Sequence, residues 1–192
     1  MKFYDISREL FSSKLYPGDP EPCFELLKRI ETGDDYNLSS FSASSHAATH
    51  IDAPKHFIFD GKSIDALDLS LFFGPCTVFS ISGLITGEDA EEIVKVSKPR
   101  ILFRGQSNAY LSQSAAFVFA DSGVLLIGTD AQSIALSDQE EIVHKELLLA
   151  QIPILEGLNL SSVQDGHYIL SAFPLKLGAL EAAPVRAVLI KD

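Results

Sequence analysis

Short apolar runs alternate with amphipathic segments through the second half of the chain. The apolar runs predict buried strands over 74–82, 101–103, 124–127 and 152–155. The amphipathic segments between them predict helices over 88–96, 112–121 and 138–150, and two further strands are expected at 168–175 and 185–190. Strands that alternate with helices are typical of an α/β sheet, so we expect an α/β fold with a mixed central sheet.

Residues with known preferences for helix ends flank the predicted helices. Ser112 is a suitable N-cap for the second helix, and Gly123 is suited to follow its end. Asp138 is placed to cap the third helix. The first helix carries acidic residues early and lysine late, which suits the helix dipole.

The first half of the chain is richer in strand and turn patterns. Residues 3–6 predict a short strand, and 22–30 and 36–43 predict a hairpin whose turn covers 31–35. A loop with two prolines and a glycine lies between the first strand and this hairpin, and it contains Tyr16. Tyr16 is a candidate for packing over a substrate, and it could equally cover the edge of the core.

Three of the five histidines fall within eleven residues, from His46 to His56. An extended strand is expected here, because Pro54 disfavours a continuing helix. Side chains of a strand alternate between its two faces, so His46, His50 and Asp52 would share one face. A turn at the proline would then bring His56 back over these three side chains.

Imidazole and carboxylate groups on one face indicate a cation site. Histidine is the commonest metal ligand at neutral pH, and a carboxylate is its usual oxygen companion. A lone histidine is more often an ordinary core or surface residue. A buried group of two imidazoles and a carboxylate without a cation would need many hydrogen bonds, and a half-satisfied cluster is costly. We therefore expect a metal site in this segment.

Two further candidates lie in the second half of the chain. Glu156 directly follows an apolar run, at the carboxyl end of a predicted strand, where ligands of open α/β sheets gather. A carboxylate there either faces solvent or pairs with a positive group. His144 lies twelve residues earlier on a predicted helix, where a solvent-facing position is the simpler expectation. Spacing in the sequence does not show whether either residue lies near His46 in the fold.

The composition narrows the classes of function. A chain of 192 residues can bury one substantial core, so we expect a single domain over 1–192. The net charge of −11 argues against a nucleic-acid partner. No apolar run reaches bilayer length and the N-terminus lacks a signal-peptide pattern, so we expect no membrane partner and a cytoplasmic location. Two isolated cysteines fit free thiols in a reducing compartment.

The histidine segment closely resembles the HxGTHxDxPxHF signature of the cyclase-like metal-dependent hydrolases, a family that includes bacterial kynurenine formamidases (arylformamidases). The segment reads His46-Ala-Ala-Thr-His50-Ile-Asp52-Ala-Pro-Lys-His56-Phe57. Weaker similarities occur in the family's order: Tyr16-Pro-Gly-Asp19, Ile101-Leu-Phe-Arg104, Gly128-Thr-Asp130-Ala-Gln-Ser133, His144, Ile152-Pro-Ile-Leu-Glu156-Gly-Leu-Asn-Leu160, Phe173-Pro-Leu175 and Pro184-Val-Arg186-Ala. Together they run through most of the chain.

The resemblance implies a site with two divalent metal ions. His46, His50 and Asp52 would hold one ion, with Asp52 bridging to the second. His144 would bind the second ion, and Glu156 would contact both.

The resemblance also implies a catalytic residue, a fold and an assembly. His56 matches the family's catalytic histidine, which acts as proton donor and acceptor. Family members adopt a swivelling β/β/α fold and are commonly homo-oligomeric, so we expect a dimer or tetramer. The implied partner is a small-molecule substrate.

Three positions depart from the family pattern. Ala48 replaces the glycine of HxGTH and adds a methyl group beside the site. Tyr16 stands where the formamidase has a tryptophan, and Gly105 stands where a threonine often follows the arginine. All five ligand positions and the catalytic histidine are kept, so the metal chemistry is not in doubt. The departures weaken the case for the formamidase's own substrate.

The expected activity is hydrolysis of an amide, formamide or related carbonyl bond. All predicted ligands are nitrogen or oxygen donors, which suits zinc and also manganese. A metal ion can lower the pKa of bound water to about 7, and His56 would shuttle the proton to the leaving group. A metal-dependent lyase or dehydratase, a non-catalytic metal- or small-molecule-binding protein, and a purely structural cluster without metal remain open alternatives.

Overall fold

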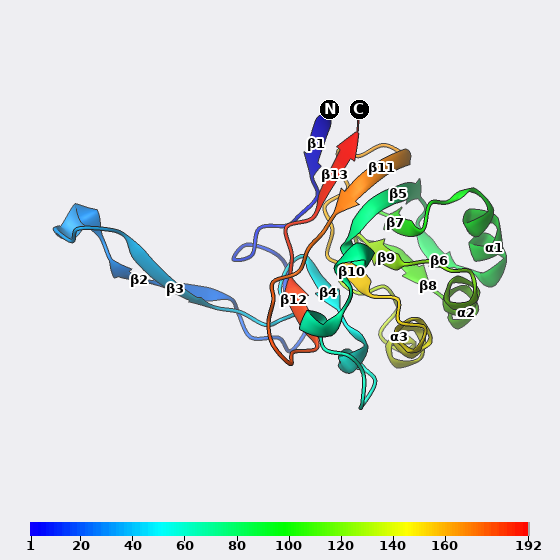
Figure 1. Cartoon of the computed structure of the whole chain (residues 1–192), viewed down its shortest axis with the longest axis horizontal. Coiled ribbons are helices and arrows are strands. Elements are labelled where there is room, and N and C mark those ends of the chain that lie inside the picture. Colours follow the sequence, from blue (N-terminus) through cyan, green and yellow to red (C-terminus); the bar gives the residue numbers. More distant parts are fainter. Residues whose placement is uncertain (192) are drawn as a thin grey trace.

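A mixed β-sheet forms the centre of the computed structural model, which describes residues 1–191 (Figure 1). Within these residues nine strands follow one another across the sheet: β1 (Lys2–Asp5), β13 (Val188–Lys191), β11 (Gly166–Ser171), β5 (Phe73–Ser80), β7 (Arg100–Arg104), β9 (Leu126–Thr129), β10 (Ile154–Glu156), β4 (His50–Asp52) and β12 (Ala182–Pro184). Strands β5, β7, β9 and β10 are parallel to one another, and the other pairings are antiparallel. The expected α/β class with a mixed sheet is confirmed.

Helices cover one face of this sheet (Figure 1): α1 (Gly87–Val96), α2 (Gln113–Asp121) and α3 (Glu140–Leu149). Strand β7 shows how the two faces divide. Ile101 and Phe103 pack into the apolar cluster shared with the helices, whereas Leu102 packs into the cluster on the opposite face. The sheet is therefore buried on both sides, and it fixes the direction of each side chain at its strand ends.

The helix ends follow the predictions in part. Ser112 caps α2 as predicted, because its hydroxyl accepts a hydrogen bond from the backbone N–H of Ala115. Gly123 follows that helix with a φ of 76°, a conformation that favours glycine. The predicted cap at Asp138 is wrong, because Gln139 is the N-cap of α3 and Asp138 lies one residue too early.

Several strands differ from their predicted positions. Strands β9 and β10 begin at residues 126 and 154 instead of 124 and 152. A small parallel sheet of β6 (Gly83–Ile85) and β8 (Ala109–Leu111) was not predicted, and neither was β12. Each of these missed strands has only three residues, which is too short for an alternating pattern to be read.

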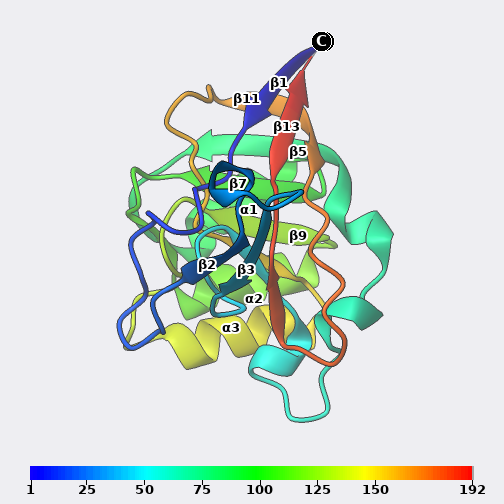
Figure 2. The same ribbon diagram turned by 90° about the vertical axis from the view of Figure 1, so that its left-hand side faces the viewer.

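A hairpin arm projects from the body of the molecule (Figure 1, left). It consists of β2 (Cys23–Lys28) and β3 (Leu38–Ser42), with a short 3₁₀ helix at Ile30–Thr32 in the predicted turn. In the view of Figure 2 the arm lies in front of the sheet, while β1 and β13 run side by side at the top. Both strands are exposed along nearly their whole length, including Phe24 and Phe41. The predicted hairpin is confirmed.

The predicted ligand strand is wrong in its first half. Only His50–Asp52 forms strand β4, and residues 45–49 form turns and bends in which Ala48 has a φ of 57°. Gly157 packs closely on this turn, because a β-carbon on Gly157 would lie 2.1 Å from the Ala48 carbonyl oxygen. The turn therefore holds His46 beside the strand instead of on its face.

Ala48→Gly should stabilise the protein, because its φ of 57° places a side chain in the left-handed region. That conformation costs a residue other than glycine about 1–2 kcal/mol, and the greater freedom of glycine in the unfolded chain offsets part of the gain. We expect the free energy of unfolding to rise by about 0.5–1 kcal/mol in urea denaturation. Ala47→Gly is the matched control, because Ala47 has no positive φ and should lose stability. A loss of stability in both variants would contradict the explanation.

Candidate metal centre

Strands β4 and β10 carry three polar side chains into one space. The two strands are antiparallel neighbours, in a register that places Glu156 opposite His50. Ile51 and Leu155 point into the apolar cluster on the face away from the helices. Because side chains alternate along a strand, His50, Asp52 and Glu156 face helix α3.

Helix α3 supplies the fourth side chain, His144. Its Nε2 atom lies 3.4 Å from Glu156 Oε1 and 3.6 Å from Asp52 Oδ2. His50 Nε2 lies 3.5 Å from Asp52 Oδ1 and 3.6 Å from Glu156 Oε2. All four residues are at most 4% exposed. The expectation from spacing alone, a solvent-facing His144, is therefore wrong.

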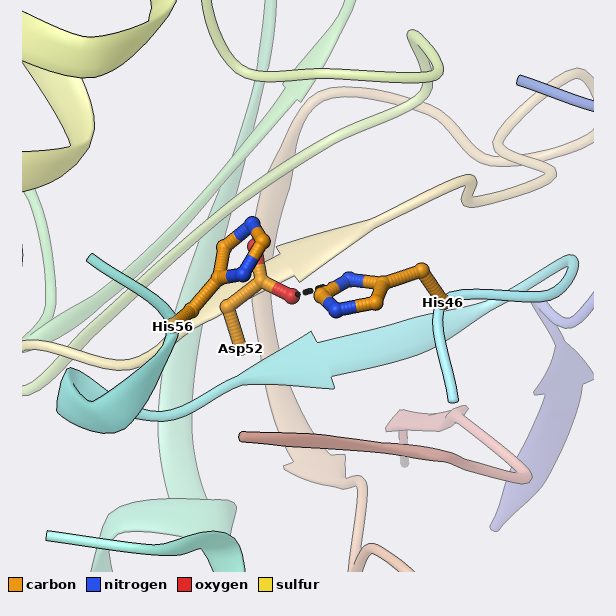
Figure 3. Close-up of side chains that lie close together, drawn as sticks. All are labelled: His46, Asp52 and His56. Atoms are coloured by element: carbon orange, nitrogen blue, oxygen red, sulfur yellow. Dashed lines mark ion pairs between the residues drawn. The ribbon is translucent and has the colours of Figure 1, made fainter. Parts of the chain in front are cut away.

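Two more imidazoles lie at the rim of this buried group (Figure 3). His46 Nδ1 is 2.9 Å from Asp52 Oδ1. His56 ends a 3₁₀ helix (Pro54–His56) and packs its ring against that of His46, with 4.3 Å between the ring centroids. The structure thus brings together the five proposed ligands and the proposed catalytic histidine.

Two overlapping groups of side chains each have donor atoms within 4.8 Å of one another, which is close enough to share a metal ion. One consists of His50, Asp52 and Glu156, and the other of His46, Asp52 and His56. Asp52 belongs to both groups, which suits the bridging position expected for it. The second group contains His56, to which the resemblance assigns proton transfer.

The contacts of Asp52 fit divalent cations. Both of its carboxylate oxygens are buried, and neither has a hydrogen-bond partner among residues 1–191. A buried carboxylate left in this state is costly. Ligand atoms about 2.1 Å from a shared ion lie about 3.4 Å apart in a tetrahedral site. The distances of 3.4–3.6 Å between the inner imidazoles and the carboxylates agree with that spacing.

Burial and charge together perturb the pKa values of the inner group. Burial lowers the pKa of His50, but its contacts with Glu156 and Asp52 outweigh this and raise the pKa to about 9. Burial also opposes the effect of these carboxylates on His144, whose pKa is raised to about 10. Burial raises the pKa of Asp52, but contacts with His144 and His46 bring it well below its usual range. Without a cation, both inner imidazoles are charged at neutral pH.

Backbone carbonyls fix the orientation of the two inner imidazoles. His144 Nδ1 lies 2.8 Å from the carbonyl oxygen of Glu140, and His50 Nδ1 lies 3.2 Å from that of Ala48. In the neutral ring, the carbonyl accepts a hydrogen bond from the Nδ1–H, which leaves the Nε2 lone pair free to bind a cation. The Ile134 N–H donates to the Glu156 carboxylate at 2.7 Å, so this acid is held as well.

A cleft of about 210 Å³ opens in front of the imidazoles. Tyr16 lies in its wall. The Tyr16 hydroxyl donates to the Glu140 carboxylate at 2.8 Å, which ties its loop to the start of α3. This hydrogen bond raises the pKa of Tyr16 to about 12, so the phenol stays neutral.

Glu181 is a residue of the site that sequence reasoning missed. Its Oε1 atom lies 3.4 Å from His46 Nε2. The residue directly precedes β12, and the pairing of β12 with β4 brings it to the histidines. Neither its spacing nor its neighbours in the sequence indicate that pairing.

Comparisons with known proteins give consistent matches. A family model described as "Putative cyclase" matches residues 4–135. Kynurenine formamidase from Bacillus anthracis is 35% identical over 202 residues, covering 98% of this chain and 97% of the relative. Kynurenine formamidase from Salinibacter ruber is 35% identical over 206 residues, with the same coverage. A solved structure described as "The Structure Of Potential Metal-Dependent Hydrolase With Cyclase Activity" is 28% identical, with coverage of 98% and 96% and a TM-score of 0.85.

Zinc binding should release at least two protons near pH 7.5, because the ligands must lose their protons to coordinate and metal-bound water can lose one as well. His50 and His144, with pKa values of about 9 and 10, carry the two ligand protons in the metal-free protein. Zinc affinity should therefore rise with pH until the pH exceeds these two pKa values, and it should fall as the solution becomes acidic. Calorimetric titrations of zinc in buffers of different ionisation enthalpy count the protons. Zinc binding without proton release would contradict the assignment of these two ligands.

Proposed function

Because the chain belongs to the cyclase family, we propose that it is a metal-dependent hydrolase of an amide, formamide or related carbonyl bond. One observation carries the proposal: the Asp52 carboxylate is buried among imidazoles without a hydrogen bond. Relatives named kynurenine formamidase and a neighbour described as a metal-dependent hydrolase support this activity. The cleft of about 210 Å³ suits a small-molecule substrate.

Two divalent ions are the proposed cofactors, with zinc preferred and manganese as the alternative. His46, His50 and Asp52 would bind one ion, while Asp52 and His144 bind the second and Glu156 contacts both. Bound ions of this kind lower the pKa of water to about 7 and polarise a carbonyl oxygen. The chain contributes a dry cage for them, since its four innermost donors are at most 4% exposed.

His56 is the proposed general acid and base. It lines the cleft, and its ring nitrogens have no hydrogen-bond partner in the described chain, unlike Nδ1 of His50 and of His144. Burial lowers its pKa below the ordinary value of 6.5, and this outweighs the opposing charge of Asp52. The ring is therefore neutral at pH 7 and accepts a proton from the attacking water at a ring nitrogen. It then donates this proton to the departing amine.

An aryl formamide is the proposed substrate, with N-formylkynurenine as the named candidate. The names of the relatives support this class. Tyr16 would pack its ring against the aromatic part of the substrate, because it stands in the cleft wall. Its hydrogen bond to Glu140 would keep the ring in place.

A homo-oligomer, a dimer or tetramer, is the proposed assembly, with the hairpin arm as the contact. An isolated two-stranded hairpin is at best marginally stable in water. Phe24 and Phe41 on the arm are 56% and 61% exposed, so a second copy would cover apolar surface there. Light scattering should give at least twice the chain mass of 20.9 kDa, and a monomer would contradict this assembly.

A cytoplasmic location completes the proposal. Cys23 and Cys76 are free thiols, which supports a reducing compartment. In the described part of the chain, no helix has both the length and the apolar character needed to cross a bilayer.

Metal-dependent hydrolysis of formamides tests the proposed function. With zinc or manganese supplied, the protein should convert N-formylkynurenine to the free amine and formate, and a chelator should stop turnover. Aryl esters extend the assay to other carbonyl bonds. If the metal-loaded protein hydrolyses neither class, the proposal is wrong. Products of elimination would indicate a lyase or dehydratase instead.

His56→Ala should keep its metal while turnover falls about 100- to 10,000-fold, because the variant lacks the proton carrier. His167→Ala is the matched control, because the His167 ring pairs with Thr77 outside the cleft. Rate assays and metal analysis of both variants provide the measurement. Unchanged turnover in His56→Ala would show that another group transfers the proton.

A further inference from the structure

The two inner imidazoles share one arrangement. Each turns Nε2 toward the buried carboxylates and rests Nδ1 on a backbone carbonyl oxygen. The carbonyl belongs to Ala48 for His50 and to Glu140 for His144. Such outer acceptors decide which ring nitrogen carries a proton and which can bind a metal.

His46 reverses this arrangement. Its Nδ1 atom is the one that pairs with Asp52, at 2.9 Å from Oδ1 (Figure 3). The oxygen that faces Nε2 belongs to a side chain instead of the backbone, namely Glu181 Oε1 at 3.4 Å. A shift of about 0.4 Å brings this contact within ordinary hydrogen-bond length.

We propose that Glu181 is a positioning residue that holds His46 with its proton on Nε2 and its Nδ1 lone pair directed at the metal site. The inference rests on the metal centre of the proposed function. A carboxylate behind a ligating imidazole fixes the ring and increases its basicity, and loss of such a partner weakens metal binding. His46 is the ligand that most needs it, because its ring lies at the rim and is 20% exposed.

The fold holds Glu181 firmly beside the ligand strand. Its carbonyl oxygen accepts a hydrogen bond from the Ala53 N–H at 2.8 Å, directly after β4. Ser45, which precedes His46 in the sequence, donates a hydrogen bond from its hydroxyl to the Glu181 carboxylate. The Glu181 side chain is 33% exposed, so it stays in contact with solvent while its charge acts on the imidazole.

A purely structural role would place Glu181 in the same position, as an anchor for Ser45. The two roles differ in what they change. An anchor affects the turn that carries His46, and its loss is reproduced by removing the Ser45 hydroxyl. A positioning residue acts through its charge on the imidazole, so a neutral residue of the same shape is enough to weaken metal binding.

Zinc affinity, measured by competition with a chromophoric chelator, distinguishes these roles. Glu181→Gln keeps the shape, and we expect it to bind zinc about 10- to 100-fold more weakly than wild type. The zinc affinity of Ser45→Ala should stay within about twofold of wild type. The same is expected of Asp65→Asn, which removes the charge of a carboxylate that accepts a hydrogen bond from the Ala179 N–H, on the loop that leads to Glu181. An unchanged affinity in Glu181→Gln, or an equal loss in Ser45→Ala, would overturn the proposal.

Nuclear magnetic resonance of zinc-loaded protein with labelled histidines gives a second readout. Long-range proton–nitrogen spectra should show His46 bound through Nδ1, with a proton on Nε2, and His50 and His144 bound through Nε2. Coordination of His46 through Nε2 would overturn the proposal. Neither experiment involves turnover, so these failures leave the hydrolase proposal intact. A wild-type protein that binds no zinc would contradict both.

Discussion

The structure depends on one constraint: the carboxylate of Asp52 lies between imidazoles that come from separate segments of the chain. Its oxygens are buried without hydrogen bonds, while ring nitrogens surround them at 2.9–3.6 Å. Leaving an ion unpaired in such a place costs several kcal/mol, and imidazoles offset this only if they take up protons. A divalent cation compensates the same charges without that protonation. The geometry of the site is therefore that of a ligand cage.

The sheet supplies the rigidity that this cage needs. Strand β4 pairs antiparallel with β10, at the point where the parallel part of the sheet ends. The period of two along each strand sends Ile51 and Leu155 into one core and the proposed ligands to the other side, where α3 covers them. His56 arrives from a separate turn, so it borders the cage without being enclosed by it. The way the chain is connected therefore places an imidazole at the border of the cage, where the proposed proton carrier would stand.

Local sequence rules predicted the elements well where those elements are long, and less well around the site. The turn at Ala48 was missed because a left-handed residue other than glycine contradicts its local preference. His144 could not be placed from its helix alone, because its burial depends on which strand lies beneath α3. Family resemblance supplied that assignment. It gave no indication of Glu181, which reaches His46 through the pairing of a three-residue strand.

The central question is whether the imidazole and carboxylate groups hold metal in the protein as it is made. Elemental analysis by mass spectrometry, on protein purified without a chelator, measures this directly. We expect about two equivalents of divalent metal per chain, with zinc or manganese as the main element. A folded protein that hydrolyses its substrate without stoichiometric metal would contradict this expectation.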